Sequence, residues 1–335
     1  MKPMAIQPDQ LADAHIGMLI TRDHAINGNR FRKGHEIVAA DIDVLRQSEL
    51  PIHAVRLEDG DVSESIAVSR IAEAIRGEAT RQDPIKQGRV NIHSTARGLL
   101  SIDPAALLAL NTVPEIGVFT HYDGVAVNAD AMIAGVKIAP VAIEEEVLDQ
   151  AIAAIASPVI DVLPFKPLVV TCIVAEDLQG RIRDRFEQTL QQKMAWYAAD
   201  LQPIVWVQED ETTVADAIER AIAASDLVFT AGSHMMDPLD SILLALGDIN
   251  APLTRLGAPA HPGSMVWIAH HRATGTPILS LASCSMFSQS TVADLLMPYI
   301  FAGVEVTNDL IATLGHGGLL DRGMDWRFPP YEAGE

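Results

Sequence analysis

The first half of the chain is patterned as short elements of both kinds. Apolar residues at helical spacing predict amphipathic helices over Glu64–Arg76, with Ile66 on the apolar face, and over Ile143–Ala156. A shorter helix is predicted over Ala40–Arg46. Apolar or alternating runs predict strands at His15–Ile20, Asn27–Ile37, Pro51–Leu57, Asn91–Ile102 and, as two or three strands, Ile116–Val141. We therefore expect a smaller α+β region over residues 1–160.

The second half of the chain alternates strands and helices more regularly. Leu168–Val174 is an apolar run rich in β-branched residues, typical of a strand buried on both faces. Ile182 and Phe186 begin a helical stripe over Arg181–Ala199. The other predicted elements are strands at Pro203–Val207, Asp226–Phe229, Met265–Ala269 and Pro277–Leu281, and helices at Val214–Ala224, capped near Thr212-Thr213, and Gln289–Phe301. This order predicts a three-layer α/β/α domain with a mostly parallel sheet over residues 168–303, followed by a carboxyl-terminal tail over 304–335.

Length and composition narrow the classes of protein. A chain of 335 residues, 49% of them hydrophobic, is long enough for two or three domains with full cores. No apolar stretch suits a membrane span, the start lacks a secretory signal pattern, and the two cysteines, Cys172 and Cys284, suggest no disulfide framework. We expect a cytoplasmic protein without membrane contact. The formal net charge of −20 argues against nucleic acid as a partner, because phosphate backbones bind basic surfaces.

Three loops of the second half follow or precede predicted strands, where a parallel sheet binds its ligands. The first loop runs from Thr230 to Asp240. In it Gly232 permits a tight exit from the strand, Ser233 can bond a phosphate, and Asp237 and Asp240 supply carboxylates. The same residue types also occur in ordinary helix capping.

The second loop is Ala260–Ser264 and the third is Ala282–Met286. The small residues of the third loop would let backbone amides approach an anion, helped by the amino terminus of the helix that follows. The candidate binding residues of these two loops are His261, Pro262, Gly263, Ser264, Ser283, Cys284 and Ser285.

The order of these three loops resembles that of molybdopterin-binding domains in molybdenum-cofactor biosynthesis proteins. Such domains carry a Gly-Gly-Thr/Ser-Ser-Val-Gly-Asp-Tyr-Asp-like turn, then an Arg-Pro-Gly-Lys-Pro loop, a hairpin and a Gly-Leu-Pro-Gly-Asn-Pro loop. The matching segments here are Thr230–Asp240, Ala260–Ser264 and Ser280–Met286, with Met265–Ala269 and Gly275–Leu279 in the places of the hairpin strands. The resemblance implies that the three loops bind molybdopterin or molybdenum cofactor.

A narrower resemblance extends into the first half. Bacterial proteins that join this domain to an amino-terminal region, and often to a molybdenum-cofactor nucleotidyltransferase, are similar at Lys33-Gly-His-Glu-Ile and at Arg56-Leu-Glu-Asp-Gly-Asp61. Gly88-Arg-Val-Asn91 and Gly315-His-Gly-Gly318 also fit the pattern. We expect the transferase part to be absent from this chain, because no Gly-rich nucleotide loop occurs.

The chain departs from the family pattern where phosphate would be held. Ala231-Gly232 replaces paired glycines, and Met236 stands where a third glycine is usual. The second loop has no arginine or lysine, and Ala282-Ser-Cys-Ser replaces Pro-Gly-Asn-Pro. Asp237 and Asp240 remain, and a carboxylate can accept the paired N–H donors of a pterin.

The resemblance therefore implies two functions. We expect binding of molybdopterin or molybdenum cofactor in its biosynthesis, handling or delivery. A molybdoenzyme or a cofactor nucleotidyltransferase would be the protein partner, and the assembly would be a homo-oligomer. The alternative is an adenylyl- or molybdenumtransferase that uses Mg²⁺ and ATP, with Asp237 and Asp240 as catalytic or magnesium-binding residues.

Enzyme classes with other signatures fit less well. A nucleotide-binding oxidoreductase needs a G-x-G-x-x-G run after a strand, and none occurs. A zinc hydrolase would need clustered ligands, but the adjacent His270 and His271 face opposite sides of a strand. Ser285 lacks the G-x-S-x-G turn of an α/β-hydrolase nucleophile.

Overall fold

The computed structural model describes residues 1–156, 158–288 and 290–331. They form two compact units between which the chain passes more than once. Unit 1 comprises Met1–Ala96, Leu100–Asp123 and Ala129–Val162, and unit 2 comprises Arg97–Leu99, Gly124–Asn128 and Leu163–Glu335. Within the described ranges, no helix has the length and apolar character needed to span a membrane.

The first part of unit 1 is a small antiparallel sheet with a hairpin. Strand β5 lies between β1 and β2. The hairpin of β3 and β4 turns at Asn27-Gly28, where both residues have positive φ, as a tight two-residue turn requires. The buried core of this first part includes Ile20, Leu45 and Ile52. The elements are β1 (Lys2–Ile6), η1 (Pro8–Gln10), η2 (Asp13–His15), β2 (Leu19–Ile20), β3 (His24–Ile26), β4 (Asn29–Phe31), η3 (Ala39–Asp41), α1 (Ile42–Leu45) and β5 (Ile52–Arg56).

The second part of unit 1 packs helix α2 on strands β8 and β12 of a four-stranded sheet with the order β10-β12-β8-β7. The buried stripe of α2 includes Ala67, Val68, Ile71 and Ile75. Ile66 is 55% exposed, so its predicted place on the apolar face is wrong: it lies one residue outside that stripe. The elements are β6 (Asp61–Ser63), α2 (Glu64–Ile75), β7 (Thr80–Gln82), β8 (Arg89–Ser94), β9 (Gly98–Ile102), α3 (Pro104–Asn111), β10 (Ile116–Thr120), β11 (Ala126–Val127), β12 (Met132–Ile138), β13 (Ala142–Glu144), α4 (Glu145–Ala153) and β14 (Ile160–Pro164).

Unit 2 contains a seven-stranded sheet of order β16-β15-β18-β21-β20-β19, in which β17 also pairs with β15. Strand β18 pairs in parallel with β15 on one side and with β21 on the other. Strand β20 runs antiparallel to both of its neighbours, β19 and β21. The elements are β15 (Val169–Val174), α5 (Gly180–Trp196), β16 (Asp200–Leu201), β17 (Val205–Trp206), α6 (Glu211–Ile222), β18 (Leu227–Ala231), α7 (Ser241–Asp248), β19 (Leu253–Leu256), β20 (Trp267–His270), β21 (Pro277–Leu281), α8 (Ser283–Phe287), α9 (Val292–Ala302), α10 (Asn308–Thr313) and η4 (Arg322–Arg327). The predicted α/β class with a mostly parallel sheet is confirmed.

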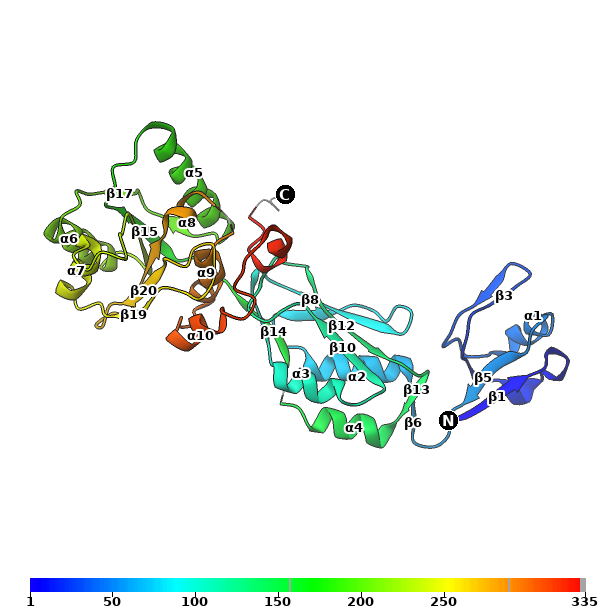
Figure 1. Ribbon diagram of the computed structural model, residues 1–335. Coiled ribbons are helices and arrows are strands. Elements are labelled where there is room, and N and C mark those ends of the chain that lie inside the picture. The colour runs from blue at the N-terminus through cyan, green and yellow to red at the C-terminus, as the bar shows by residue number, and fades with distance from the viewer. Residues whose placement is uncertain (157, 289, 332–335) are drawn as a thin grey trace. The chain divides into compact units, whose positions relative to one another are not determined.

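Apolar side chains on both faces of this sheet explain its three layers. Cys172 and Val174 pack with α5 and α9 in one core, and the alternate residue Ile173 packs with α6 and α7 in another. Helices α5 and α9 can be followed on one side of the strands in Figure 1, with α6 and α7 on the other. Residues after α9, among them Val306 and Phe328, complete the first core.

Several boundaries in unit 2 differ from the sequence prediction. Ile182 is 56% exposed, because the buried stripe of α5 begins at Phe186. Helix α6 is capped by Asp210, whose carboxylate accepts from the Thr213 amide, rather than at Thr212-Thr213. Strand β18 continues to Ala231, so the first residues of the predicted first loop belong to the strand.

Candidate functional site

The first and third loops meet at one edge of the sheet in unit 2. Both follow parallel strands, β18 and β21, while the antiparallel strand β20 begins at the same edge just after the second loop. They enclose a cleft of about 580 Å³. Its lining residues are Ser233, His234, Met235, Met236, Asp237, Pro238, Met265, Ala282 and Ser283.

Gly232 sets the direction of the first loop. Its φ of +96° lies in a region that favours glycine, and a Cβ atom there would come within 3.0 Å of the Ala175 backbone carbon. The sequence expectation that a glycine permits a tight exit from β18 agrees with this geometry.

Asp240 holds the first loop together. Its side chain is 3% exposed and caps α7 by accepting from the Leu243 amide at 2.9 Å. It also accepts from the Ser233 hydroxyl at 3.1 Å and the His234 amide at 2.6 Å. The indole of Trp267 in turn donates to Ser233 at 3.2 Å. With three protein donors on its carboxylate, Asp240 positions the loop and has little capacity left for a ligand.

Asp237 is placed differently. It is exposed on the wall of the cleft, and one of its oxygens accepts from the Leu239 amide at 2.9 Å. Within the described part of the chain its other oxygen accepts no hydrogen bond from the protein, so it can accept from a bound molecule. The same residues contain no group of three or more His, Cys, Asp or Glu side chains arranged for a metal ion.

The second loop lies beside helix α9 rather than in the cleft. The backbone of His261 bonds to Gly318 and Leu320, and the Pro262 carbonyl accepts from Val292. A Cβ atom on Gly263 would come within 2.8 Å of the Val292 nitrogen. The backbone of the second loop therefore packs against neighbouring segments, whereas the side chain of His261 is exposed. Of the described residues that line the cleft, Met265 comes from this region, and the predicted His261, Pro262, Gly263 and Ser264 do not line it.

The third loop contributes Ser283 to the cleft, and Cys284 beside it is exposed with a free thiol. Ser285 is 2% exposed and Thr230, inside β18, is fully buried. Among the described residues the hydroxyl of neither has a hydrogen-bond partner. Ser285 faces the interior beside Lys193 of α5, whose ammonium donates to the Ser285 carbonyl at 3.2 Å.

The cleft also contains residues that the sequence prediction missed. Met235, Met236 and Met265 supply polarisable apolar surface, and Met236 is 86% exposed. The clustering of methionines around the loops is the signal that could have found them. Among the described residues that line the cleft, none is lysine or arginine. The imidazole of His234 lies 3.8 Å from the carboxylate of Glu209. The cleft therefore suits a flat, largely neutral group better than a phosphate.

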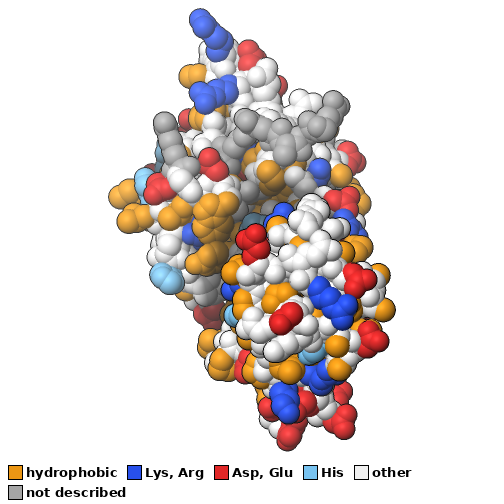
Figure 2. Space-filling model, turned by 90° about the vertical axis from the view of Figure 1, so that its right-hand side faces the viewer, with side chains coloured by type: hydrophobic (Ala, Val, Ile, Leu, Met, Phe, Trp, Pro, Cys, Tyr) orange, Lys and Arg blue, Asp and Glu red, His pale blue; other side chains and the backbone are white. Residues whose placement is uncertain are grey.

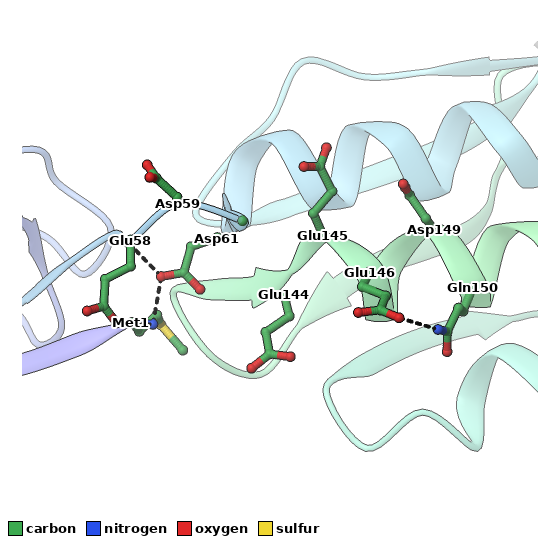
Figure 3. Close-up of a pocket in the computed structure, with 10 residues that line it drawn as sticks. Met1, Glu58, Asp59, Asp61, Glu144, Glu145, Glu146, Asp149 and Gln150 are labelled. Atoms are coloured by element: carbon green, nitrogen blue, oxygen red, sulfur yellow. Dashed lines mark hydrogen bonds and ion pairs between the residues drawn. The ribbon is translucent and has the colours of Figure 1, made fainter.

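A hollow of about 640 Å³ in unit 1 has the opposite character to an anion site (Figure 3). The terminal ammonium of Met1 lies 2.6 Å from Asp61 and 3.3 Å from Glu58. The Glu58 amide and then this ammonium lower the pKa of Asp61. The lining carboxylates are Glu58, Asp59, Asp61, Glu144, Glu145, Glu146 and Asp149. Among the described side chains on the face in Figure 2, basic ones are interspersed with acidic ones.

Comparison with known proteins gives no family. No protein-family profile and no curated protein matches the chain. Two solved structures of the molybdopterin biosynthesis MoeA protein from Pyrococcus horikoshii are similar to it: one at 12% identity and a TM-score of 0.31 over 72% of this chain and 79% of that one, the other at 13% and 0.26 over 73% and 80%. A NadC deletion mutant has 10% identity and a TM-score of 0.15 over 48% of this chain and 69% of that one. TM-scores of this size establish neither a shared fold nor a shared function.

Proposed function

We propose that this protein binds molybdopterin or molybdenum cofactor in the cleft between the first and third loops, and acts in its biosynthesis, handling or delivery. The observation that carries the proposal is the exposed carboxylate of Asp237 in a cleft at the ligand-binding edge of the sheet. A volume of about 580 Å³ lies in the ordinary range for a small-molecule site.

The chemistry of the lining residues fits a pterin. A pterin ring presents paired N–H donors at one edge, and the Asp237 carboxylate can accept from them. The thioethers of Met235, Met236 and Met265 offer apolar, polarisable surface for the flat ring, because methionine sulfur makes favourable contacts with aromatic systems.

Binding without catalysis is favoured over group transfer. Adenylylation or molybdenum insertion would need cations to stabilise charge on phosphate, and no lysine or arginine is among the residues lining the cleft. A magnesium ion would have Asp237 available, whereas the oxygens of Asp240 are already bonded to the loop and to α7.

The decisive experiment is a titration of the purified protein with molybdopterin. Asp237→Asn should weaken binding about tenfold or more, because a hydrogen bond to a carboxylate is worth about 1.5–3 kcal/mol. Asp248→Asn, an exposed aspartate at the end of α7, serves as the matched control and should bind as the wild type does.

Two outcomes would contradict the proposal. Absence of binding at tens of micromolar would reject the cofactor assignment. Turnover with ATP and Mg²⁺ that Asp237→Asn abolishes would instead favour the transferase, in which this carboxylate takes part in catalysis.

A further inference from the structure

Unit 1 contains a second large cleft, of about 810 Å³, with a different chemistry. Four arginine and lysine side chains line it, against two carboxylates, Glu36 and Glu64. The whole chain has 24 Lys and Arg against 44 Asp and Glu, so this local excess of positive charge reverses the overall balance. The four cations are Arg30, Arg32, Lys33 and Lys86.

Two of these cations form no ion pair within the described residues, although Arg32, after Lys33 and Arg30, contributes to the lowered pKa of Asp23. Arg30 pairs with Asp23 at 3.4 Å, and Lys33 pairs with Glu64 at 3.4 Å. Among the ion pairs of the described residues, none includes Arg32 or Lys86, and both side chains are exposed. Their charges are available to an anion that enters the cleft.

The wall of the cleft is fixed by a buried carboxylate. Glu64, 7% exposed, opens helix α2 and pairs with Lys33, whose ammonium also donates to the Ala139 carbonyl at 3.1 Å. Gly88 leaves room for this carboxylate, because a Cβ atom there would lie 2.2 Å from its carboxyl carbon. Gly34, with φ +82°, also approaches Glu64. The Lys33-Gly34 and Gly88-Arg sequences, which the cleft in unit 2 does not use, thus meet at one carboxylate.

Other parts of the wall add to the positive potential and supply apolar surface. Ser63 and Ser65 lie at the start of the twelve-residue helix α2, which has no side-chain cap. Its amino terminus therefore adds partial positive charge beside the cations. Ile66 and Ile85 line the same cleft and are 55% and 43% exposed. Exposed isoleucines beside unpaired cations suit a molecule with an anionic end and an apolar body.

We propose that this cleft binds a small phosphate monoester whose organic part is apolar or aromatic. The phosphate contacts Arg32 and Lys86, and the organic part covers Ile66 and Ile85. A single phosphate matches two unpaired cations. The site does not depend on the cofactor assignment, because the cleft, its cations and its apolar wall all belong to unit 1.

The experiment is a calorimetric titration of the full chain with phenyl phosphate, inorganic phosphate and phenol. Phenyl phosphate should bind about tenfold more tightly than inorganic phosphate, because burial of the ring on Ile66 and Ile85 adds apolar contact. Phenol alone should give no measurable binding. The double variant Arg32→Glu with Lys86→Glu should weaken phenyl phosphate binding about a hundredfold or more, since each lost charged contact costs about tenfold.

The matched control reverses two exposed arginines of unit 2, Arg220→Glu with Arg272→Glu, for the same change in net charge. It should leave the affinity within about twofold of the wild type at moderate salt. Equal loss in both double variants would show only a general charge effect and would overturn the site. Equal affinity for phosphate and phenyl phosphate would overturn the monoester assignment, and so would absence of binding at millimolar ligand. Unchanged circular dichroism spectra of the variants exclude unfolding as the cause of a loss.

Discussion

Asp237 and Asp240 lie three residues apart in the first loop, yet the structure gives them different surroundings. The side chain of Asp240 is enclosed by donors from Ser233, His234 and Leu243, whereas that of Asp237 is exposed at the cleft. The sequence predicts that carboxylates lie here but cannot rank them. Their hydrogen-bond partners depend on where Trp267 and α7 are packed, which is a property of the folded chain.

Removal of the Asp240 carboxylate should destabilise unit 2 rather than abolish a reaction. We expect Asp240→Ala to lower the free energy of unfolding by about 3 kcal/mol, because it removes a helix cap and leaves buried donors unpaired. Asp210→Ala, which removes the cap of α6 at an exposed position, should cost about 1 kcal/mol. All four tryptophans lie in unit 2, so urea unfolding followed by tryptophan fluorescence measures both variants. Equal losses would contradict the enclosed role of Asp240.

Lys193 was not distinguishable in the sequence from the other polar residues of α5. In the structure it is nearly fully buried, and its ammonium lies 2.8 Å from Asp294 of α9. Asp294 also accepts from the Thr291 hydroxyl at 2.7 Å and the Tyr331 hydroxyl at 2.8 Å. Burial and the nearby Asp294 raise the pKa of Tyr331, so its phenol stays protonated and donates.

Breaking this pair should be costly because it leaves one charge buried without its partner. We expect Lys193→Met to lower the free energy of unfolding of unit 2 by about 3–5 kcal/mol in urea. Asp294→Asn should also destabilise it, and the double variant should lose clearly less than the sum of the two single losses. Additive losses would show that the two side chains do not interact energetically.

At the scale of elements, continuous apolar patterns predict strands and helices well, whereas some short elements are set by pairing and leave no clear pattern. The strands β15 and β21 are apolar runs long enough to stand out, and α2 and α5 have regular stripes. The two-residue strand β17 falls within the predicted strand Pro203–Val207. Strand β16, also of two residues, has no predicted counterpart, because it is defined by its pairing with β15. Helix α7 has no predicted bounds, because the residues before it, Asp240 among them, fit both a helix cap and a ligand loop.

The exit of β18 depends on one glycine. Gly232→Ala should lower the free energy of unfolding of unit 2 by about 1–3 kcal/mol, because alanine is strained at this φ and its Cβ meets the Ala175 backbone. Gly247→Ala in α7, with nothing within 4 Å of the added Cβ, should instead stabilise the unit by up to about 1 kcal/mol through helix propensity. Thermal unfolding of the two variants checks the difference in sign. A neutral Gly232→Ala would contradict the required turn.

At the scale of the whole molecule, contacts between segments far apart in the chain could not be predicted from the sequence. Two short segments that interrupt unit 1, Arg97–Leu99 and Gly124–Asn128, belong to unit 2, and no local sequence pattern marks them. Residues after 303 were interpreted as a tail, yet Tyr331 bonds to Asp294 inside the core.

Homo-oligomerisation stays a prediction, and light scattering coupled to size-exclusion chromatography would reject it by giving the mass of one chain.

Two histidines should make both units less stable as the pH falls. Burial lowers the pKa of His24, in unit 1, and of half-buried His270, in unit 2, below the ordinary value of 6.5. The unfolded chain then binds more protons than the folded one. The free energy of unfolding therefore has its full value above pH 6.5 and decreases as the pH falls from 6.5 toward the lower pKa of the folded state. The lowered pKa of Asp61 acts in the same direction, but in the acidic range.

The prediction is measured by urea unfolding between about pH 7.5 and about pH 5.5, a range that brackets histidine titration. Tryptophan fluorescence reports unit 2 and circular dichroism reports both units. His270→Gln should flatten the pH dependence seen by fluorescence, whereas His24→Gln should flatten only that seen by circular dichroism. His316→Gln, at an exposed position, is the control. Loss of the fluorescence slope in His24→Gln would show that the two units do not unfold separately, because a titration in unit 1 would then determine the stability of unit 2.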